Sequence, residues 1–128
     1  MSYRVLIVDD SHAMQEIIRR IVTISGLEVS EFLKALNGNA ALELLETNTV
    51  DLILTDVNMP ECGGEEMMRR LKMNSRLRHI PVIVVSTDAT RARVEQMKQL
   101  GAQGYISKPF TPEKLRSVIR QVLETSHA

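Results

Sequence analysis

Short apolar runs alternate along this chain with segments of helical periodicity, and this alternation limits the folds that it can adopt. The apolar runs are residues 4–8, 32–36, 51–56, 81–86 and 104–107, and each has the length of a buried strand. Apolar residues recur at helical spacing within 14–22, 40–45, 67–71, 90–100 and 115–123. The alternation predicts an α/β fold, a doubly wound sheet of five parallel strands covered by five helices.

Local signals mark several of the expected boundaries. Gly26 ends the first helical pattern, and Asn37-Gly38 forms a turn before the second. Thr111 is expected to cap the last helix, with Pro112 at its first position. The 128 residues suffice for one compact domain, which we expect to span residues 1–128.

Composition and charge exclude several classes of protein. No apolar run reaches membrane-spanning length, and Cys62 is the single cysteine, so no internal disulfide can form. We therefore expect a cytoplasmic protein without membrane contact. Residues 1–64 carry ten acidic and four basic residues, and residues 65–128 carry six and twelve. The basic stretch 69–79 has no interleaved aromatics, which favours a solvated helix end over direct nucleic-acid binding.

The informative polar residues stand where the expected strands end. Asp9 and Asp10 follow the first strand, and Asp56, Ser86 and Lys108 end the third, fourth and fifth. The carboxyl ends of parallel strands meet at one edge of a sheet, where such folds bind ligands. These five side chains are therefore expected to share one rim.

The residue types at this rim indicate phosphoryl chemistry. Three carboxylates in one pocket need a cation, and an all-oxygen ligand set favours Mg²⁺ over zinc. A lysine and a hydroxyl can hold the oxygens of a phosphoryl group, and an aspartate can accept that group as an aspartyl-phosphate. Taken singly, each residue also has a structural explanation: Asp10 or Ser11 as a helix cap, Asp56 as a turn residue, Ser86 as a strand-end hydroxyl.

Four motifs in this order and spacing resemble the receiver domain of bacterial two-component response regulators, of the single-domain CheY-like type. They are LIVDDS (6–11), DLILTDVNMP (51–60), PVIVVSTDA (81–89) and GYISKPF (104–110). The resemblance covers essentially the whole chain. It implies the flavodoxin-like strand order 2-1-3-4-5.

The resemblance also implies a role for each matching residue. Asp56 corresponds to the phosphoacceptor, and Mg²⁺ is held by Asp9, Asp10, Asp56 and the main-chain carbonyl of Asn58. Lys108 corresponds to the phosphate-pairing lysine, with a cis bond to Pro109. Ser86 corresponds to the switch hydroxyl. Tyr105 corresponds to the aromatic switch.

The same resemblance implies partners and an output surface. A sensor histidine kinase or a phosphotransfer protein would supply the phosphoryl group. A downstream protein would bind the face formed by residues 90–100, the fifth strand and the last helix, where it would contact Arg91, Arg93, Val94 and Met97. The residues Asn58 and Tyr105 lean towards the chemotaxis and flagellar type. Gly63-Gly64 and Cys62 depart from the family pattern, which predicts a looser loop after Asp56.

The alternative functions are a phosphatase, a nucleotide-binding module and a receiver fragment of a larger protein. A Mg²⁺-dependent phosphatase with an aspartate nucleophile would need a D-x-D motif after the first strand and a substrate cap, and the chain offers neither. A nucleotide-binding module would need a glycine-rich phosphate loop, which is also absent. The chain could instead be a receiver fragment of a larger transcriptional regulator. We expect no enzyme activity beyond the chain's own phosphorylation and dephosphorylation.

Overall fold

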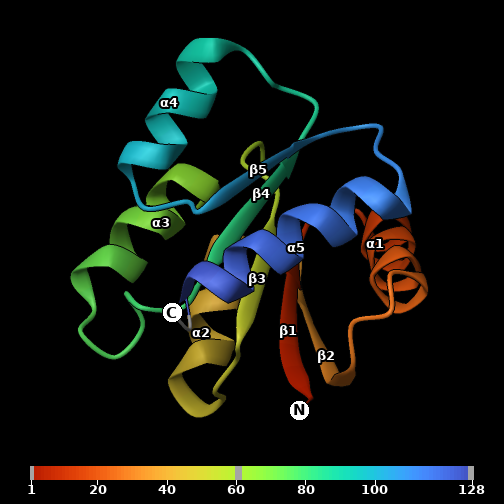
Figure 1. Ribbon diagram of the computed structural model, residues 1–128. Coiled ribbons are helices and arrows are strands. Elements are labelled where there is room, and N and C mark those ends of the chain that lie inside the picture. Colours follow the sequence, from red (N-terminus) through yellow and green to blue (C-terminus); the bar gives the residue numbers. More distant parts are fainter. Residues whose placement is uncertain (1, 60–61, 127–128) are drawn as a thin grey trace.

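The computed structural model describes residues 2–59 and 62–126, in which strands and helices alternate (Figure 1). In chain order they are β1 (Tyr3–Val8), α1 (His12–Ile24), β2 (Val29–Ala35), α2 (Gly38–Thr47), β3 (Leu52–Thr55), α3 (Gly64–Met73), β4 (Val82–Ser86), α4 (Arg91–Gln99), β5 (Gly104–Ser107) and α5 (Pro112–Ser126). The predicted alternation is confirmed. In the described part of the chain, no helix is both long and apolar enough to cross a membrane.

The five strands form one parallel sheet in the order β2-β1-β3-β4-β5. This confirms the predicted doubly wound, flavodoxin-like architecture and places β3 in the centre. Helices α1 and α5 cover one face, and α2, α3 and α4 cover the other (Figure 1). Two separate apolar clusters, one on each face, form the core.

The central strands are apolar throughout because both faces of the sheet are covered. In β1, Val5 and Ile7 pack towards α1 and α5, whereas Leu6 and Val8 pack towards the opposite helices. All four side chains are fully buried. The helices use their apolar stripes in the same way, for example Ile18 and Val22 of α1.

Side-chain caps fix where the helices begin. Ser11 Oγ accepts a hydrogen bond from the Met14 amide (3.2 Å), so Ser11 and not Asp10 caps α1. Thr111 accepts the corresponding bond from the Lys114 amide (3.1 Å), as the sequence predicts for α5. The Ser11 cap leaves the Asp10 carboxylate available to the rim of the sheet.

The boundaries of some elements differ from the predicted ones. Strand β2 begins at Val29, three residues before the expected start, because pairing with β1 and not burial holds its first residues. Strand β3 ends before Asp56 and begins after Asp51. Asp51 lies just before the strand, where its main-chain amide donates to the Arg4 carbonyl (2.8 Å) and its carboxylate accepts a hydrogen bond from the Arg4 amide (2.8 Å).

Candidate functional site

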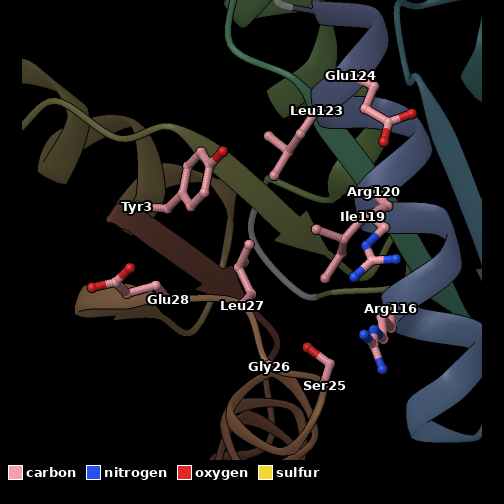
Figure 2. Close-up of a pocket in the computed structure, with 10 residues that line it drawn as sticks. All are labelled: Tyr3, Ser25, Gly26, Leu27, Glu28, Arg116, Ile119, Arg120, Leu123 and Glu124. Carbon is pink, nitrogen blue, oxygen red and sulfur yellow. The ribbon is translucent and has the colours of Figure 1, made fainter. Parts of the chain in front are cut away.

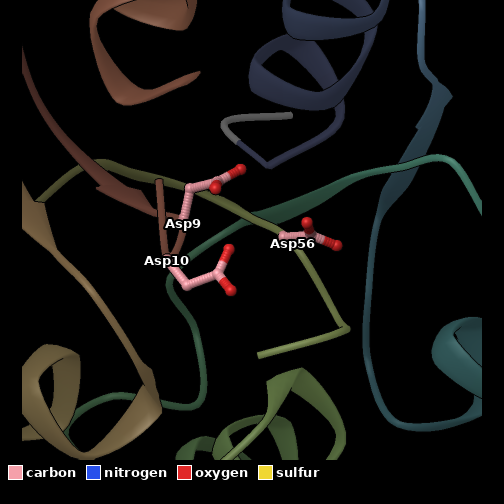
Figure 3. Close-up of side chains that lie close together, drawn as sticks. All are labelled: Asp9, Asp10 and Asp56. Carbon is pink, nitrogen blue, oxygen red and sulfur yellow. The ribbon is translucent and has the colours of Figure 1, made fainter. Parts of the chain in front are cut away.

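The predicted site residues lie together at the carboxyl edge of the sheet. Asp9 and Asp10 directly follow β1, Asp56 follows the central strand β3, Ser86 is the last residue of β4, and Lys108 follows β5. Figure 3 shows that Asp9 and Asp10 come from neighbouring positions of one strand end and Asp56 from another. One carboxylate oxygen from each of these three residues lies within 4.8 Å of the other two.

Lys108 joins two of the three carboxylates. Its Nζ atom lies 3.1 Å from Asp9 Oδ2 and 3.2 Å from Asp56 Oδ2. Its main-chain amide donates to the Ser86 carbonyl (2.9 Å), which fixes the lysine beside β4. The bond from Lys108 to Pro109 is cis, as the resemblance implies.

Burial and charge shape the protonation of this cluster. Burial raises the pKa of Asp9, although hydrogen bonds from the Ser11 amide and Lys108 oppose the shift. Burial alone would lower the pKa of Lys108, but its hydrogen bond to Asp9 and the charges of Asp56 and Asp9 outweigh that effect and raise it. Lys108 is therefore a cation at neutral pH.

The donor set fits a divalent metal ion. Three carboxylates face one lysine ammonium, so negative charge is in excess at the rim. All three donors are hard oxygen ligands, and Asp10 is exposed at the solvent side. Mg²⁺ binds sites of this kind through one or two carboxylates and keeps several waters.

Asp56 is held with one oxygen towards the loop and the other towards the lysine. Its Oδ1 atom accepts hydrogen bonds from the amides of Val57 (2.6 Å) and Asn58 (3.2 Å). Its Oδ2 atom faces Lys108. The side chain is 13 % exposed, whereas that of Asp9 is 2 % exposed, so solvent reaches Asp56 more readily.

Ser86 and Tyr105 meet at a residue that the sequence analysis did not single out, Asp88. The buried Ser86 hydroxyl accepts a hydrogen bond from the Asp88 amide (3.1 Å), and the Tyr105 hydroxyl donates to the Asp88 carbonyl. Burial raises the pKa of Tyr105. The signal in the sequence that could have indicated Asp88 is its position two residues after Ser86, where the chain leaves β4 towards α4.

The expected output face holds fewer accessible residues than predicted. Met97 is fully buried because it anchors α4 against the sheet, so a partner cannot contact it. Arg93 turns inward and its side chain is 20 % exposed. Arg91 is exposed and Val94 half-buried, so these two remain available.

The loop between β3 and α3 is tightly packed where the structure describes it, in contrast to the looser loop expected from Gly63-Gly64. A Cβ atom on Gly64 would lie 2.7 Å from both the Asp56 carbonyl oxygen and Val57 Cα. Cys62 adopts a left-handed conformation, with φ of 52°. Pro60 and Glu61, which belong to the same loop, lie outside the described residues.

A separate groove of about 650 Å³ lies at the opposite edge of the sheet (Figure 2). It runs between the start of β1, the turn into β2 and the last helix, and it is lined by Tyr3, Ser25, Gly26, Leu27, Glu28, Arg116, Ile119, Arg120, Leu123 and Glu124. Small-molecule ligands usually bind in concave pockets of this kind. A phosphoryl group does not require such a pocket, because a few charged groups at the open carboxyl edge of the sheet can hold it.

A five-stranded doubly wound sheet with three aspartates and a lysine at its carboxyl edge is the arrangement that the resemblance to receiver domains implies. The comparison with protein families agrees: residues 5–120 match the family described as the response regulator receiver domain. The chain belongs to this family.

Curated relatives include chemotaxis proteins. The chain is 36 % identical over 124 residues to chemotaxis protein CheY1 of Helicobacter pylori, covering 96 % of this chain and 98 % of that protein. It is 34 % identical over 121 residues to chemotaxis protein CheY of Pseudomonas aeruginosa, covering 94 % and 96 %. The chain is thus a receiver domain homologous to the chemotaxis CheY proteins.

Solved structures show the same architecture. Chemotaxis response regulator CheY4 of Vibrio cholerae superposes with a TM-score of 0.84 at 30 % identity, covering 96 % of this chain and all of that one. A putative response regulator from Chloroflexus aurantiacus gives a TM-score of 0.87 at 23 % identity, covering 97 % and 99 %, which supports the fold alone.

Proposed function

We propose that residues 1–128 form one receiver domain that is switched by phosphorylation of Asp56. The observation that carries the proposal is the position of Asp56: it follows the central strand, beside two further carboxylates, with Lys108 Nζ 3.2 Å from its Oδ2 atom. A sensor histidine kinase or phosphotransfer protein is the donor. The bond from an Asp56 oxygen to phosphorus forms as the bond to the donor's imidazole nitrogen breaks, and its electron pair stays on that nitrogen.

We propose that Mg²⁺ is held by the carboxylates of Asp9, Asp10 and Asp56 and by the main-chain carbonyl of Asn58. The excess negative charge of the carboxylates supports this assignment. When bound, the ion supplies neutralisation of the transferring phosphoryl oxygens.

The side chains around Asp56 bind and report the phosphoryl group in this proposal. Lys108 is already bonded to Asp56 and can donate to a phosphoryl oxygen, because an ammonium has three donors. The Ser86 hydroxyl would donate to another oxygen, and Tyr105 would follow it. Water later hydrolyses the acyl-phosphate, which releases phosphate and restores the Asp56 carboxylate. We propose no activity on other substrates.

The partner is proposed to be a protein that binds the face of α4, β5 and α5, and no nucleic acid or membrane is assigned. Two curated relatives are named chemotaxis proteins, which supports a role in chemotaxis or flagellar control. A single cysteine and the absence of a membrane-length apolar run in the sequence support a cytoplasmic location.

A test of the acceptor compares Asp56→Asn with Asp51→Asn, an exposed aspartate at the other end of β3. Each protein is incubated with acetyl phosphate and Mg²⁺ and followed by intact-protein mass spectrometry. We expect the parent and Asp51→Asn to gain one hydroxylamine-sensitive phosphoryl group and Asp56→Asn to gain none. Equal labelling of Asp56→Asn would reject the assignment, and sustained turnover of a phosphomonoester would favour the phosphatase alternative.

A further inference from the structure

Arg93, in the first turn of α4, extends from its helix towards the loops that border Asp56. Its Nη2 atom lies 3.5 Å from the side-chain oxygen of Asn58, in the loop after β3. Its Nη1 atom lies 3.5 Å from Glu65 Oε2 of α3 and 2.7 Å from Gln96 Oε1 of α4 itself. One guanidinium therefore contacts three segments of the chain.

The contacts of Arg93 outside α4 are long. The 3.5 Å separations lie at the outer limit of hydrogen bonding. The Nε atom is buried with no hydrogen-bond acceptor among the described residues, and Asp88 Oδ2 is 3.9 Å away. A charged donor left unsatisfied in this way gains if a stronger acceptor comes within reach. The one short bond, to Gln96, would move with the helix and does not hold the guanidinium against the loops.

Two of the residues beside Arg93, Asn58 and Asp88, also touch the proposed phosphorylation site. Asn58 donates its amide to Asp56 Oδ1 (3.2 Å). Asp88 donates its amide to the Ser86 hydroxyl and accepts a hydrogen bond from Tyr105. Arg93 is thus one residue removed from Asp56 through Asn58, and one residue removed from Ser86 through Asp88.

We propose that Arg93 is a positioning residue that couples the charge at Asp56 to the position of α4. This inference rests on the proposed phosphorylation of Asp56. A phosphoryl group adds a charge of about −1.5 to −2, which attracts the guanidinium away from its long contacts with Glu65 and Asp88. Because Arg93 belongs to α4, the start of this helix shifts with it, as a change in the populations of two arrangements.

The carboxylates of Glu65 and Asp88 compete with the phosphoryl group for the same cation. Removing the cation should therefore weaken the binding of a phosphoryl mimic, and removing a competing carboxylate should strengthen it. These opposite effects on the affinity for the mimic distinguish coupling from a purely structural role. In a purely structural role, both substitutions would change the stability of the fold but would not change the affinity in opposite directions.

The test measures the dissociation constant of beryllofluoride in saturating Mg²⁺ for the parent, Arg93→Gln and Arg91→Gln. Arg91 is an exposed arginine of the same turn and serves as the matched control. We expect Arg93→Gln to bind about two- to fivefold more weakly, as for one partly exposed charge contact, and Arg91→Gln to match the parent. Arg93→Lys, which keeps the charge, should recover most of the affinity.

Two further measurements sharpen the outcome. Glu65→Gln should bind beryllofluoride more tightly than the parent, and the double variant with Arg93→Gln should match Arg93→Gln alone. Hydrogen exchange of amides 91–99 should change on beryllofluoride binding in the parent and change less in Arg93→Gln. If Arg93→Gln does not fold, Glu65→Gln decides the matter, since an affinity for beryllofluoride equal to that of the parent would reject the coupling.

The failures of the two proposals are distinguishable. If the parent binds beryllofluoride but Arg93→Gln binds it equally well with the same exchange response, Arg93 has no coupling role. If the parent itself neither binds beryllofluoride nor accepts a phosphoryl group, the proposed function of Asp56 fails first.

Discussion

The three aspartates at the rim differ mainly in how far their side chains are exposed to solvent. Asp9 is buried and bonded to Lys108, Asp56 is slightly exposed and bonded to Lys108, and Asp10 is exposed. A buried carboxylate is costly to keep charged without a partner, so Asp9 depends most on the lysine. Asp10 can exchange water for a metal ion at the smallest cost of desolvation. Three chemically equal side chains are thereby suited to different tasks.

Removing the charge of Asp10 should affect metal binding and stability in opposite directions. In Asp10→Asn, the Mg²⁺ concentration for half-maximal phosphorylation by acetyl phosphate should rise by about tenfold or more, equivalent to about 1.4 kcal/mol. The metal-free protein should melt at a higher temperature, because one like charge is removed beside Asp9 and Asp56. An unchanged Mg²⁺ titration would show that Asp10 does not hold the ion.

The rim residues could be predicted from the sequence because parallel strands all end at one edge. That rule alone was enough to predict that Asp9, Asp56 and Lys108 lie together, without any knowledge of side-chain contacts. The inward turn of Arg93 could not be predicted, since α4 is polar around most of its circumference and its sequence does not mark a buried face. Met97, the buried anchor of that helix, was for the same reason misplaced on the surface.

Among the elements, the loop between β3 and α3 couples packing directly to the site. Gly64 opens α3 with its backbone against Asp56 and Val57, and its amide donates to the Val57 carbonyl (3.1 Å). The sequence showed two glycines and suggested flexibility. Glycine here instead permits a close approach of two backbone segments, which only the three-dimensional contacts reveal.

Substitution of Gly64 by alanine should disturb the site as well as the fold. The added methyl group meets backbone atoms that cannot move independently, so we expect a loss of about 1–3 kcal/mol in unfolding free energy. Urea unfolding measures this loss, and acetyl phosphate labelling should slow because Asp56 is displaced.

Gly26→Ala provides the control for this prediction. Gly26 has φ of +91° and open space around its Cβ position, far from the rim. Its replacement should cost about 1–2 kcal/mol through backbone strain alone and leave the labelling rate unchanged. Equal labelling rates in both variants would contradict the proposed link between Gly64 packing and Asp56.

Strand β2 shows a second limit of sequence interpretation at the level of elements. Ser30 and Glu31 are exposed, so hydrophobic periodicity does not mark them as a strand. Glu31 is a strand residue because it pairs with Arg4 of β1, whose guanidinium bonds its carboxylate at 2.7 Å. Ser30 lies at an irregularity of the register between Val29 and Glu31. The pairing of an edge strand depends on two segments of the chain, so the hydrophobic pattern of one segment does not predict it.

In the whole molecule, the rim and the proposed output face are joined through Asp88. Its amide binds the Ser86 hydroxyl at the site, and its carbonyl binds Tyr105, whose strand β5 lies at the edge of the sheet beside α4 and α5. If the Ser86 hydroxyl moves towards a phosphoryl oxygen, the Asp88 amide loses this acceptor. The main chain that holds Tyr105 is then free to shift, and a tightly packed interior transmits such a change.

Loss of the Ser86 hydroxyl should therefore separate phosphorylation from its readout. Ser86→Ala should still bind beryllofluoride at Asp56, but Tyr105 should respond less. With Tyr3 replaced by phenylalanine, 3-fluorotyrosine labels Tyr105 alone among the two tyrosines, and its ¹⁹F resonance reports the environment of the ring. We expect beryllofluoride to shift this resonance clearly in the parent and only weakly in Ser86→Ala.

Ser107 provides the control for this prediction. It pairs with Ser86 in the neighbouring strand and is exposed, so Ser107→Ala should respond like the parent. A full shift in Ser86→Ala would show that the signal reaches Tyr105 without the hydroxyl.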